Sequence, residues 1–539
     1  GIGTFRDLAL QGVDVLLVDR ADYCAGASSA SSHMVHGGIR YLENGEFRLV
    51  REAVAERNRL IENAPHLVKP LPTLFPIFKT FSGLLNAPLK FLGLMDKPTE
   101  RGAIVIKIGM SLYDMYTRGQ KTVPKHTFLG RRASLEKFPK LNRKIIYTGT
   151  YYDGAMPSPE RIAIELIQDT LAASSQAYAA NYVEMDRLEG NQVVLVDKMN
   201  NEQFYVEPKL VINASGPWID FTNLAMGKQT EFIGGTKGSH LVLEHPELRE
   251  QIGDYEFFFE NKDGRIVLIF PLEDKVMIGT SDIRIEDPDE ARCTPEEVDY
   301  FFEMVGRIFP DIRLDRKQIV YQFSGVRPLP YSKDNRTGQI SRNHKIEKLP
   351  AGTVASFPVL SLVGGKWTSF RAFSEQVTDA VLEFFKVKRK VDTKDLAIGG
   401  SKDYPKTEDE LVQYQEKLVK KFDAPENRVE ILISRYVTIA EAFLKQPELV
   451  SPTGYWPFTS YTPEEIDRLA KEEDVIHLDD LILRRTMIGK LGLLDGEGLN
   501  ALAEIVARAK GWSDDFKTEE IDRTVKIMQD QHGVVLRPE

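Results

Sequence analysis

GIGTFRDLALQGVDVLLVDR, residues 1–20, is the stretch that decides the fold. Its first half has the apolar spacing of a short helix, which Gly12 can end as a C-cap. Residues 15–18 then form a continuous apolar strand with Asp19 at its tip. A helix, a glycine stop, a buried strand and a terminal acid are typical of the second half of a dinucleotide-binding βαβ unit. The apolar residues of the helix are Phe5, Leu8 and Leu10.

The position of Gly1 supports this interpretation. In such a unit the acid accepts hydrogen bonds from an adenosine ribose, about twenty residues after a glycine-rich turn. Gly1 lies eighteen residues before Asp19, which is where the last glycine of a GxGxxG turn belongs. We therefore expect a strand and two further glycines to precede Gly1 in a longer natural chain. On these residues alone, an ordinary helix–strand pair opening an α/β domain is the alternative.

Composition narrows the classes of protein. Of the 539 residues, 42% are hydrophobic and 28% charged, which excludes a largely disordered chain. There are 70 basic and 80 acidic residues, so the net charge of −10 argues against binding to nucleic acid. Two cysteines, Cys24 and Cys293, are too few for a structural zinc site or a disulfide framework. No metal site is predicted, and no apolar run is long enough to span a bilayer.

The pattern of elements divides the chain in two. Up to about residue 385, strands and helices alternate. Charged helices follow from about residue 405, and their starts are marked at Thr407 and Thr462. Residues 401–406 are the expected hinge, and the predicted domains are 1–390 and 400–539. Strands are expected at 193–196, 210–213, 241–243, 266–270 and 276–278, and helices at 45–61, 159–173, 295–308 and 369–386.

Three short motifs with small residues follow in order along the first domain. A serine cluster precedes HGGIRY at 36–41, an apolar strand ends in ASGPW at 214–218, and GGKWTS occupies 364–369. Hydroxyl groups can donate to a phosphate, and glycine allows the backbone to approach a bound group closely. Each motif alone is a weak signal, because glycine pairs usually mark ordinary turns. Their combination predicts a bound dinucleotide.

The joint pattern resembles the FAD-dependent glycerol-3-phosphate dehydrogenases of the aerobic, quinone-linked type. The resemblance covers essentially the whole chain. It implies an α/β fold in which a glutathione-reductase-like, Rossmann-type FAD domain interleaves with an α+β substrate domain built on an antiparallel sheet, followed by a C-terminal helical domain. It rests on SSASSHMVHGGIRYLENGEFRLVREAVAER, VINASGPWID, KGSH, GTSD, SGVRPL, ISRNH, GGKWTSFR and LRRT.

The resemblance also implies the reaction, which is oxidation of sn-glycerol 3-phosphate to dihydroxyacetone phosphate with hydride transfer to flavin N5. Arginine suits a phosphate because its fork donates in parallel pairs. We assign Arg40 and Lys366 mainly to the phosphate, with Arg342 as a weaker third cation. The resemblance places Arg327 near the substrate hydroxyl, where its charge favours an alkoxide-like oxygen.

Two histidines compete for the role of general base. His36 lies four residues before Arg40 and is the first candidate, and His240 is its rival. Tyr41 is expected to hydrogen-bond the substrate. Without the motifs, each arginine is better explained by a surface ion pair and each histidine by a structural role. The residues expected to bind FAD are Gly1, Asp19, Ser28, Ser29, Gly37, Gly38, Val183, Ala214, Ser215, Gly216, Trp218, Gly365, Lys366 and Thr368.

Residues 68–108 predict contact with a membrane surface. The segment has six basic and two acidic residues, interleaved with large apolar side chains, within an acidic protein. Anionic headgroups would attract the lysines, and prolines break the segment into pieces too short to cross a bilayer. A loop packed on its own domain is the alternative. With membrane quinone as electron acceptor, we expect a peripheral, monotopic enzyme on the cytoplasmic face of the inner membrane.

Other functions stay open on the sequence alone. An oxidase that passes electrons to oxygen is one alternative, and a flavin-binding redox sensor without turnover is another. Only residues 328–363 separate Arg327 from the GGKWTS motif, which favours the dehydrogenase because oxidases of the family often carry a long insertion there. The oligomeric state is open, with a homodimer among the alternatives.

Overall fold

The computed structural model describes residues 1–39, 46–80, 103–116, 122–261, 265–332 and 343–536. Three predicted site residues, Arg40, Tyr41 and Arg342, lie outside these ranges. So do residues 81–102 of the predicted membrane segment. The other predicted site residues lie within the described ranges.

The opening stretch folds as its sequence predicts. Helix α1 (Ile2–Leu10) ends before Gly12, which has a φ of +76°. Strand β1 (Val15–Val18) follows and pairs in parallel with β6 (Ala177–Ala180). Parallel β10 (Val211–Asn213) and β18 (Val359–Val363) form a second small sheet, which antiparallel β17 (Lys345–Leu349) extends. A third contains β7 (Val183–Glu189), β8 (Gln192–Asp197) and β9 (Gln203–Val206).

The larger sheet of the first domain is mixed. Its order is β15-β11-β14-β13-β12-β3-β5-β2, with β16 paired to β11 and β4 paired to β5. The predicted antiparallel character holds for most pairs, but β3 and β12 are parallel. Its strands are β2 (Met34–Val35), β3 (Lys69–Ile77), β4 (Thr127–Gly130), β5 (Tyr147–Ala155), β11 (Thr236–Leu243), β12 (Glu256–Glu260), β13 (Ile266–Leu272), β14 (Lys275–Gly279), β15 (Ile283–Arg284) and β16 (Ile319–Arg327).

Both faces of this sheet are buried. Side chains alternate along a strand, so Val242 and Met277 pack on one face while Leu241 and Ile278 pack on the other. The second face is covered by α9 (Pro295–Ile308), the helix predicted at 295–308, which begins with a capping box of Thr294 and Glu297. Burial on both sides explains why these strands read as continuous apolar runs.

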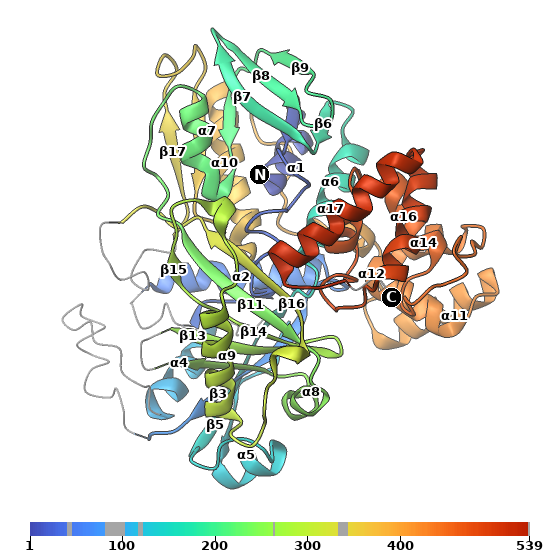
Figure 1. Ribbon diagram of the computed structural model, residues 1–539. Helices are drawn as coiled ribbons and strands as arrows, with labels where there is room; N and C mark the ends of the chain where they lie inside the picture. Colours follow the sequence, from blue (N-terminus) through green and yellow to red (C-terminus); the bar gives the residue numbers. More distant parts are fainter. Residues whose placement is uncertain (40–45, 81–102, 117–121, 262–264, 333–342, 537–539) are drawn as a thin grey trace.

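The other described helices surround the sheets (Figure 1). Helix α1 packs against α6 and α10 at the dinucleotide-binding end. Predicted helices 45–61, 159–173 and 369–386 are confirmed as α2, α6 and α10. The helices before the C-terminal domain are α2 (Phe47–Asn63), α4 (Ala103–Tyr116), α5 (Arg131–Lys137), α6 (Pro159–Ala173), α7 (Ile219–Ala225), α8 (Pro246–Ile252) and α10 (Phe370–Phe385).

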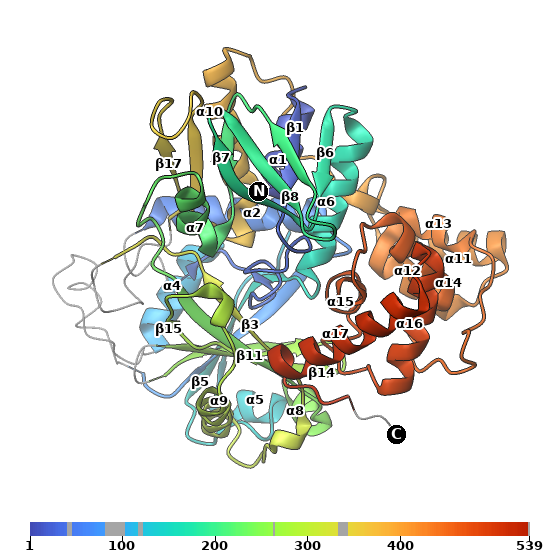
Figure 2. The ribbon, with the colours of Figure 1, turned by 45° about the horizontal axis from the view of Figure 1, so that its top comes forward.

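The C-terminal helices form a separate group that packs against the first face of the large sheet (Figures 1 and 2). Thr407 and Thr462 cap α11 and α14, as the sequence predicts. A π-helical turn, η9 (Leu481–Arg485), carries the first three residues of the LRRT motif, and Thr486 follows it as the C-cap. The helices are α11 (Glu408–Phe422), α12 (Glu426–Tyr436), α13 (Ala440–Leu444), α14 (Pro463–Glu472), α15 (Leu478–Asp480), α16 (Gly496–Lys510) and α17 (Asp514–His532).

The structure changes the interpretation of the predicted membrane segment. Residues 69–77 form β3, between β12 and β5, and most of their apolar side chains are buried. The prediction of a surface segment is therefore wrong for this part of 68–108. Among the described residues, no helix combines the length and apolar character needed to cross a membrane.

Candidate active site

A single continuous cavity of about 3050 Å³ extends from the opening helix and strand to the large sheet. It is lined by residues from all three predicted motifs. Two predicted residues, Ser29 and Gly37, do not line it. The predicted residues on its wall are Gly1, Asp19, Ser28, His36, Gly38, Val183, Ala214, Ser215, Gly216, Trp218, His240, Arg327, Gly365, Lys366 and Thr368.

The HGG and GGKWTS motifs are joined through one threonine. Thr368 Oγ1 accepts a hydrogen bond from the His36 backbone N–H at 3.1 Å and donates to the His36 carbonyl at 3.1 Å. Trp367 Nε1 donates to the carbonyl of Ser28 at 3.0 Å, which adds the serine cluster. Residues far apart in sequence therefore form one wall, and the backbone of His36 is fixed within it.

Ser29 and Gly37, the two predicted residues that do not line the cavity, form hydrogen bonds that hold its wall in place. Gly37 donates its N–H to Asp153 Oδ1 at 2.9 Å, and a Cβ on Gly37 would overlap the ring of Tyr113. Ser29 Oγ donates to the carbonyl of Gly26 at 3.1 Å. Both residues therefore shape the loop that lines the cavity, although neither is on the cavity wall itself.

A buried polar cluster behind Gly37 was not predicted. Asp153, on β5, also accepts hydrogen bonds from Tyr113 at 2.6 Å and Tyr151 at 2.9 Å, and forms an ion pair with Arg57. The Arg57 and Asp153 side chains are both fully buried. The sequence gives no local signal for this cluster, because its members come from α2, α4 and β5.

Glu256 on β12 lies near this cluster and gives a testable pH effect. Burial raises its pKa from 4.5 to about 8. Thr73 donates to Oε2 at 3.0 Å, and the buried Oε1 has no partner among the described residues. Folding therefore favours the neutral form, and this stability is lost as pH rises from about 4.5 through about 8.

We expect Glu256→Gln to become progressively more stable than the parent protein as pH rises from about 5 to about 8. The gain should reach about 3–5 kcal/mol, because each pKa unit corresponds to about 1.4 kcal/mol. Urea unfolding of both proteins at several pH values measures this difference. A difference that is constant with pH would show that the Glu256 carboxyl does not titrate in this range.

Arg327 ends β16 with its guanidinium group at the cavity. Its Nη2 donates to Thr280 Oγ1 at 2.8 Å and to the Ser281 carbonyl at 3.1 Å, and Nη1 lies 3.3 Å from Asp282 Oδ1. Gly238 lies beside it, where a Cβ would collide with the guanidinium group. These contacts fix the direction of the positive charge, and the side chain keeps 25% of its surface exposed.

His240 on β11 is held more deeply. Its ring stacks on Phe323 with centroids 4.8 Å apart, and its Nε2 lies 3.0 Å from Ser32 Oγ. Gly279 leaves the space that the ring occupies. Burial, and then the charge of Arg327, lower the pKa of His240 to about 3. The imidazole is therefore neutral near pH 7, and its buried Nδ1 has no partner among the described residues.

The end of the cavity near α1 and β1 has groups suited to a dinucleotide. Asp19 is at the tip of β1, and burial raises its pKa to about 6, so hydroxyl donors from a ribose would stabilise its ionised form. Val183 donates its N–H to the Asp19 carbonyl at 2.8 Å and forms the adjacent wall. Trp218 packs closely over Gly26, and its buried Nε1 has no partner among the described residues. An acceptor on a bound group would satisfy that donor.

Fold and cavity together define a dinucleotide-binding protein with a helical C-terminal domain. Residues 1–355 match the family described as FAD dependent oxidoreductase, and residues 391–517 match the C-terminal domain of alpha-glycerophosphate oxidase. The chain is 35% identical to glycerol-3-phosphate dehydrogenase from Synechocystis sp., over 71% of this chain and 68% of that protein. It is 27% identical to aerobic glycerol-3-phosphate dehydrogenase from Staphylococcus aureus, over 99% and 93%.

Solved structures show the same fold. The glycerol-3-phosphate dehydrogenase from Bacillus halodurans complexed with FAD gives a TM-score of 0.73 at 21% identity, covering 98% of this chain and 92% of that one. L-alpha-glycerophosphate oxidase from Mycoplasma pneumoniae with FAD bound gives 0.50 at 15%, covering 73% and 94%. The chain belongs to the family of FAD-dependent glycerol-3-phosphate dehydrogenases and oxidases. The predicted fold class and the FAD cofactor are confirmed.

Proposed function

We propose that this protein oxidises sn-glycerol 3-phosphate to dihydroxyacetone phosphate and passes the electrons to a membrane quinone. The observation that carries the proposal is the meeting of His36, His240, Arg327 and Lys366 on one cavity, which is also lined by residues expected to bind FAD. The family supports the same substrate, because its named relatives are glycerol-3-phosphate dehydrogenases.

The reaction needs both a hydride and a proton to leave the substrate. Bound FAD supplies the acceptor for the hydride. When the C2–H bond breaks with its electron pair, the C2 hydroxyl loses its proton and a carbonyl forms. The fixed guanidinium group of Arg327 stabilises the negative charge that develops on this oxygen.

We propose that His36 accepts the proton of the C2 hydroxyl. The backbone of His36 is held by Thr368. His240, with a pKa of about 3, is a weak base but remains a neutral hydrogen-bonding group at physiological pH. Lys366 begins the turn η6 (Trp367–Ser369) and lines the cavity, where its ammonium group can pair with the substrate phosphate. Arg40, Tyr41 and Arg342 retain their proposed roles in substrate binding.

A quinone acceptor is favoured over oxygen by the short connection between Arg327 and the GGKWTS motif. The test is an assay of the purified holoenzyme with either a soluble quinone analogue under anaerobic conditions or oxygen alone. We expect rapid quinone reduction with glycerol 3-phosphate and little hydrogen peroxide. Equal turnover with oxygen would support an oxidase, and no turnover with either acceptor would refute the proposed substrate or reaction.

We also propose that the surface around α4 contacts a membrane, at the cytoplasmic face of the inner membrane. Ile108 and Met115 on this helix are 57% and 53% exposed, and Lys107 directly precedes Ile108 in the sequence. This surface directly follows the part of 68–108 that lies outside the described residues. Apolar side chains that enter the interface while lysines meet anionic headgroups would bind a bilayer peripherally.

Replacing Ile108 and Met115 with serine should reduce binding to anionic liposomes about tenfold, because burial of two large apolar side chains is lost. Co-sedimentation measures the bound fraction. The matched control replaces Phe204 and Tyr205, which are 44% and 51% exposed on β9, with serine. An equal loss for both double variants, or no loss for either, would contradict a membrane contact at α4.

A further inference from the structure

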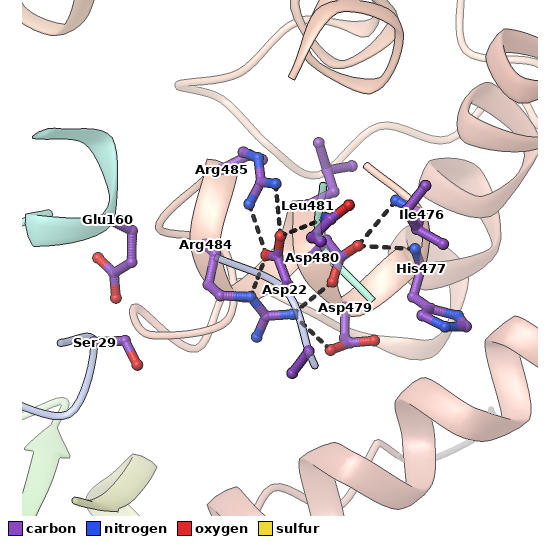
Figure 3. Close-up of polar contacts among 12 residues, drawn as sticks. Asp22, Ser29, Glu160, Ile476, His477, Asp479, Asp480, Leu481, Arg484 and Arg485 are labelled. Carbon is purple, nitrogen blue, oxygen red and sulfur yellow. Dashed lines mark hydrogen bonds and ion pairs between the residues drawn. The ribbon is translucent and has the colours of Figure 1, made fainter. Parts of the chain in front are cut away.

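A buried ion cluster joins the C-terminal domain to the loop that follows β1 (Figure 3). At its centre is Asp22, whose side chain is fully buried. Arg485 donates from Nη1 to Asp22 Oδ2 at 2.7 Å and from Nη2 to Oδ1 at 2.8 Å. Arg484 Nε also donates to Oδ2, and Asn181 Nδ2 donates to Oδ1 at 3.0 Å. Burial alone would raise the pKa of Asp22, but Arg485 and Arg484 outweigh it and hold the pKa well below its usual range.

Other residues of the C-terminal domain hold Arg484 and Arg485 in place. Arg484 Nη2 donates to Asp479 Oδ2 at 2.9 Å and to Asp480 Oδ1 at 2.6 Å. Arg485 Nε donates to the carbonyl of Glu473 at 2.8 Å. A guanidinium fork whose direction is fixed loses little freedom when it binds a carboxylate. The C-terminal domain therefore presents a preorganised site for Asp22.

The loop held by this cluster also lines the cofactor cavity. Within residues 19–28, every residue except Asp22 and Tyr23 is on the cavity wall. Those two turn toward the C-terminal domain, where the Tyr23 hydroxyl donates to Asp474 Oδ2 at 3.3 Å. The loop therefore lies between the cavity and the C-terminal helices, and a displacement of Asp22 would move residues that line the cavity.

The conformation of this loop needs such support. Cys24 has a φ of +66°, in the left-handed region that side chains with a Cβ rarely adopt. Strained residues of this kind persist where the surrounding structure fixes them. Asn181 extends the support to the neighbouring wall, where Tyr182 donates its N–H to Ala21 at 3.1 Å and Val183 donates to Asp19 at 2.8 Å.

We propose that Asp22, Asn181, Arg484 and Arg485 form a clamp through which the C-terminal domain retains FAD. Asp22 is a positioning residue, since it does not line the cavity and acts through the loop that carries Asp19 and Ser28. The inference rests on FAD as the cofactor and is independent of the proposed substrate and electron acceptor. It gives the helical domain a role in cofactor binding.

The test compares Asp22→Asn and Arg485→Lys with a control that breaks a different contact between the same domains. Gln168 Nε2 on α6 donates to the carbonyl of Glu472 on α14 at 2.8 Å, and Gln168→Ala removes this hydrogen bond. Apoprotein from each variant is titrated with FAD, and flavin fluorescence gives the dissociation constant. Melting temperatures of the apoproteins measure stability separately.

We expect both clamp variants to weaken FAD binding by about tenfold or more, because each loses a charge-assisted hydrogen bond at the loop. Gln168→Ala should lower the melting temperature slightly but change the FAD dissociation constant by less than about twofold. At saturating FAD, the KM for substrate should stay unchanged in every variant. If Asp22→Asn does not fold, the FAD dissociation constant of the milder Arg485→Lys variant tests the proposal.

Two results would overturn the clamp. One is an unchanged FAD dissociation constant in a folded Arg485→Lys or Asp22→Asn protein. The other is an equal weakening of FAD binding by Gln168→Ala, which would show that any loss of a contact between the domains has the same effect. Failure of the protein to oxidise glycerol 3-phosphate would refute the proposed function but leave the titration unaffected.

Discussion

Arg327→Met is expected to lower kcat for glycerol 3-phosphate by about 10²- to 10³-fold, the usual loss when one fixed donor to a developing oxyanion is removed. The guanidinium group is held by Thr280 and Asp282, so its charge is already oriented before the substrate binds. The substrate itself is neutral at C2, and the interaction strengthens only as the hydride leaves. The loss should therefore appear in kcat more than in KM.

Two control variants separate charge from general disturbance of the cavity. Arg327→Lys keeps the charge but loses the fork, and should retain part of the activity. Arg292, an exposed residue at the same cavity, donates to the backbone carbonyls of Asp289 and Ala291. Arg292→Met should change kcat by less than about twofold if oxyanion stabilisation is specific to Arg327. Normal kcat in Arg327→Met would refute the assigned role.

Arg57→Met is expected to reduce the free energy of unfolding by about 3–5 kcal/mol, because it leaves the buried Asp153 charge without its cation. Arg57 also donates to Tyr113 and to the carbonyl of Tyr152, both at 2.7 Å. Methionine fills much of the volume but replaces none of these donors. Chemical denaturation at neutral pH measures the loss.

A second substitution tests whether the unpaired buried charge of Asp153 causes this loss of stability. Asp153→Asn in the Arg57→Met background removes the unpaired charge and should recover part of the stability. The matched surface control is Lys198→Met, which breaks an ion pair with Glu184 in which both side chains are partly exposed. That control should cost no more than about 1 kcal/mol. A similar cost for the buried and surface variants would contradict the importance of burial.

Local sequence signals predicted much of the fold. Thr294 with Glu297 marks the start of α9, since a capping box depends only on residues three apart. The helix–glycine–strand pattern ending at Asp19 is local in the same way, and it is confirmed as α1 and β1. Apolar runs located the strands that are buried on both faces.

The prolines of β3 explain the main error in the fold. Pro76 was interpreted as a break in a surface segment, but it lies within a strand, together with Pro70 and Pro72. The three prolines are separated by even numbers of residues, so all of their missing N–H groups would point to the same edge of β3. The other edge of the strand therefore keeps its hydrogen-bond donors. Pairing of β3 with β5 from Lys69 to Ile77 depends on contacts that a local pattern does not reveal.

The residues that line the cavity could be predicted where they belong to motifs, but the distant residues that hold them in place could not. The motifs brought His36, Lys366 and Thr368 to one cavity. Asp153, which accepts the N–H of Gly37, lies 116 positions away from it, and Arg485 lies 463 positions from Asp22. Single acidic and basic residues are common in any sequence, so only the folded chain shows which of them pair.

The most direct measurement is the flavin absorbance of the purified holoenzyme after anaerobic mixing with sn-glycerol 3-phosphate. We expect the oxidised flavin spectrum to bleach in one turnover, with one dihydroxyacetone phosphate formed per flavin, while glycerol at the same concentration has little effect. Bleaching by glycerol and glycerol 3-phosphate alike would contradict recognition of the phosphate. A flavin spectrum that stays oxidised with glycerol 3-phosphate would contradict the proposed reaction itself.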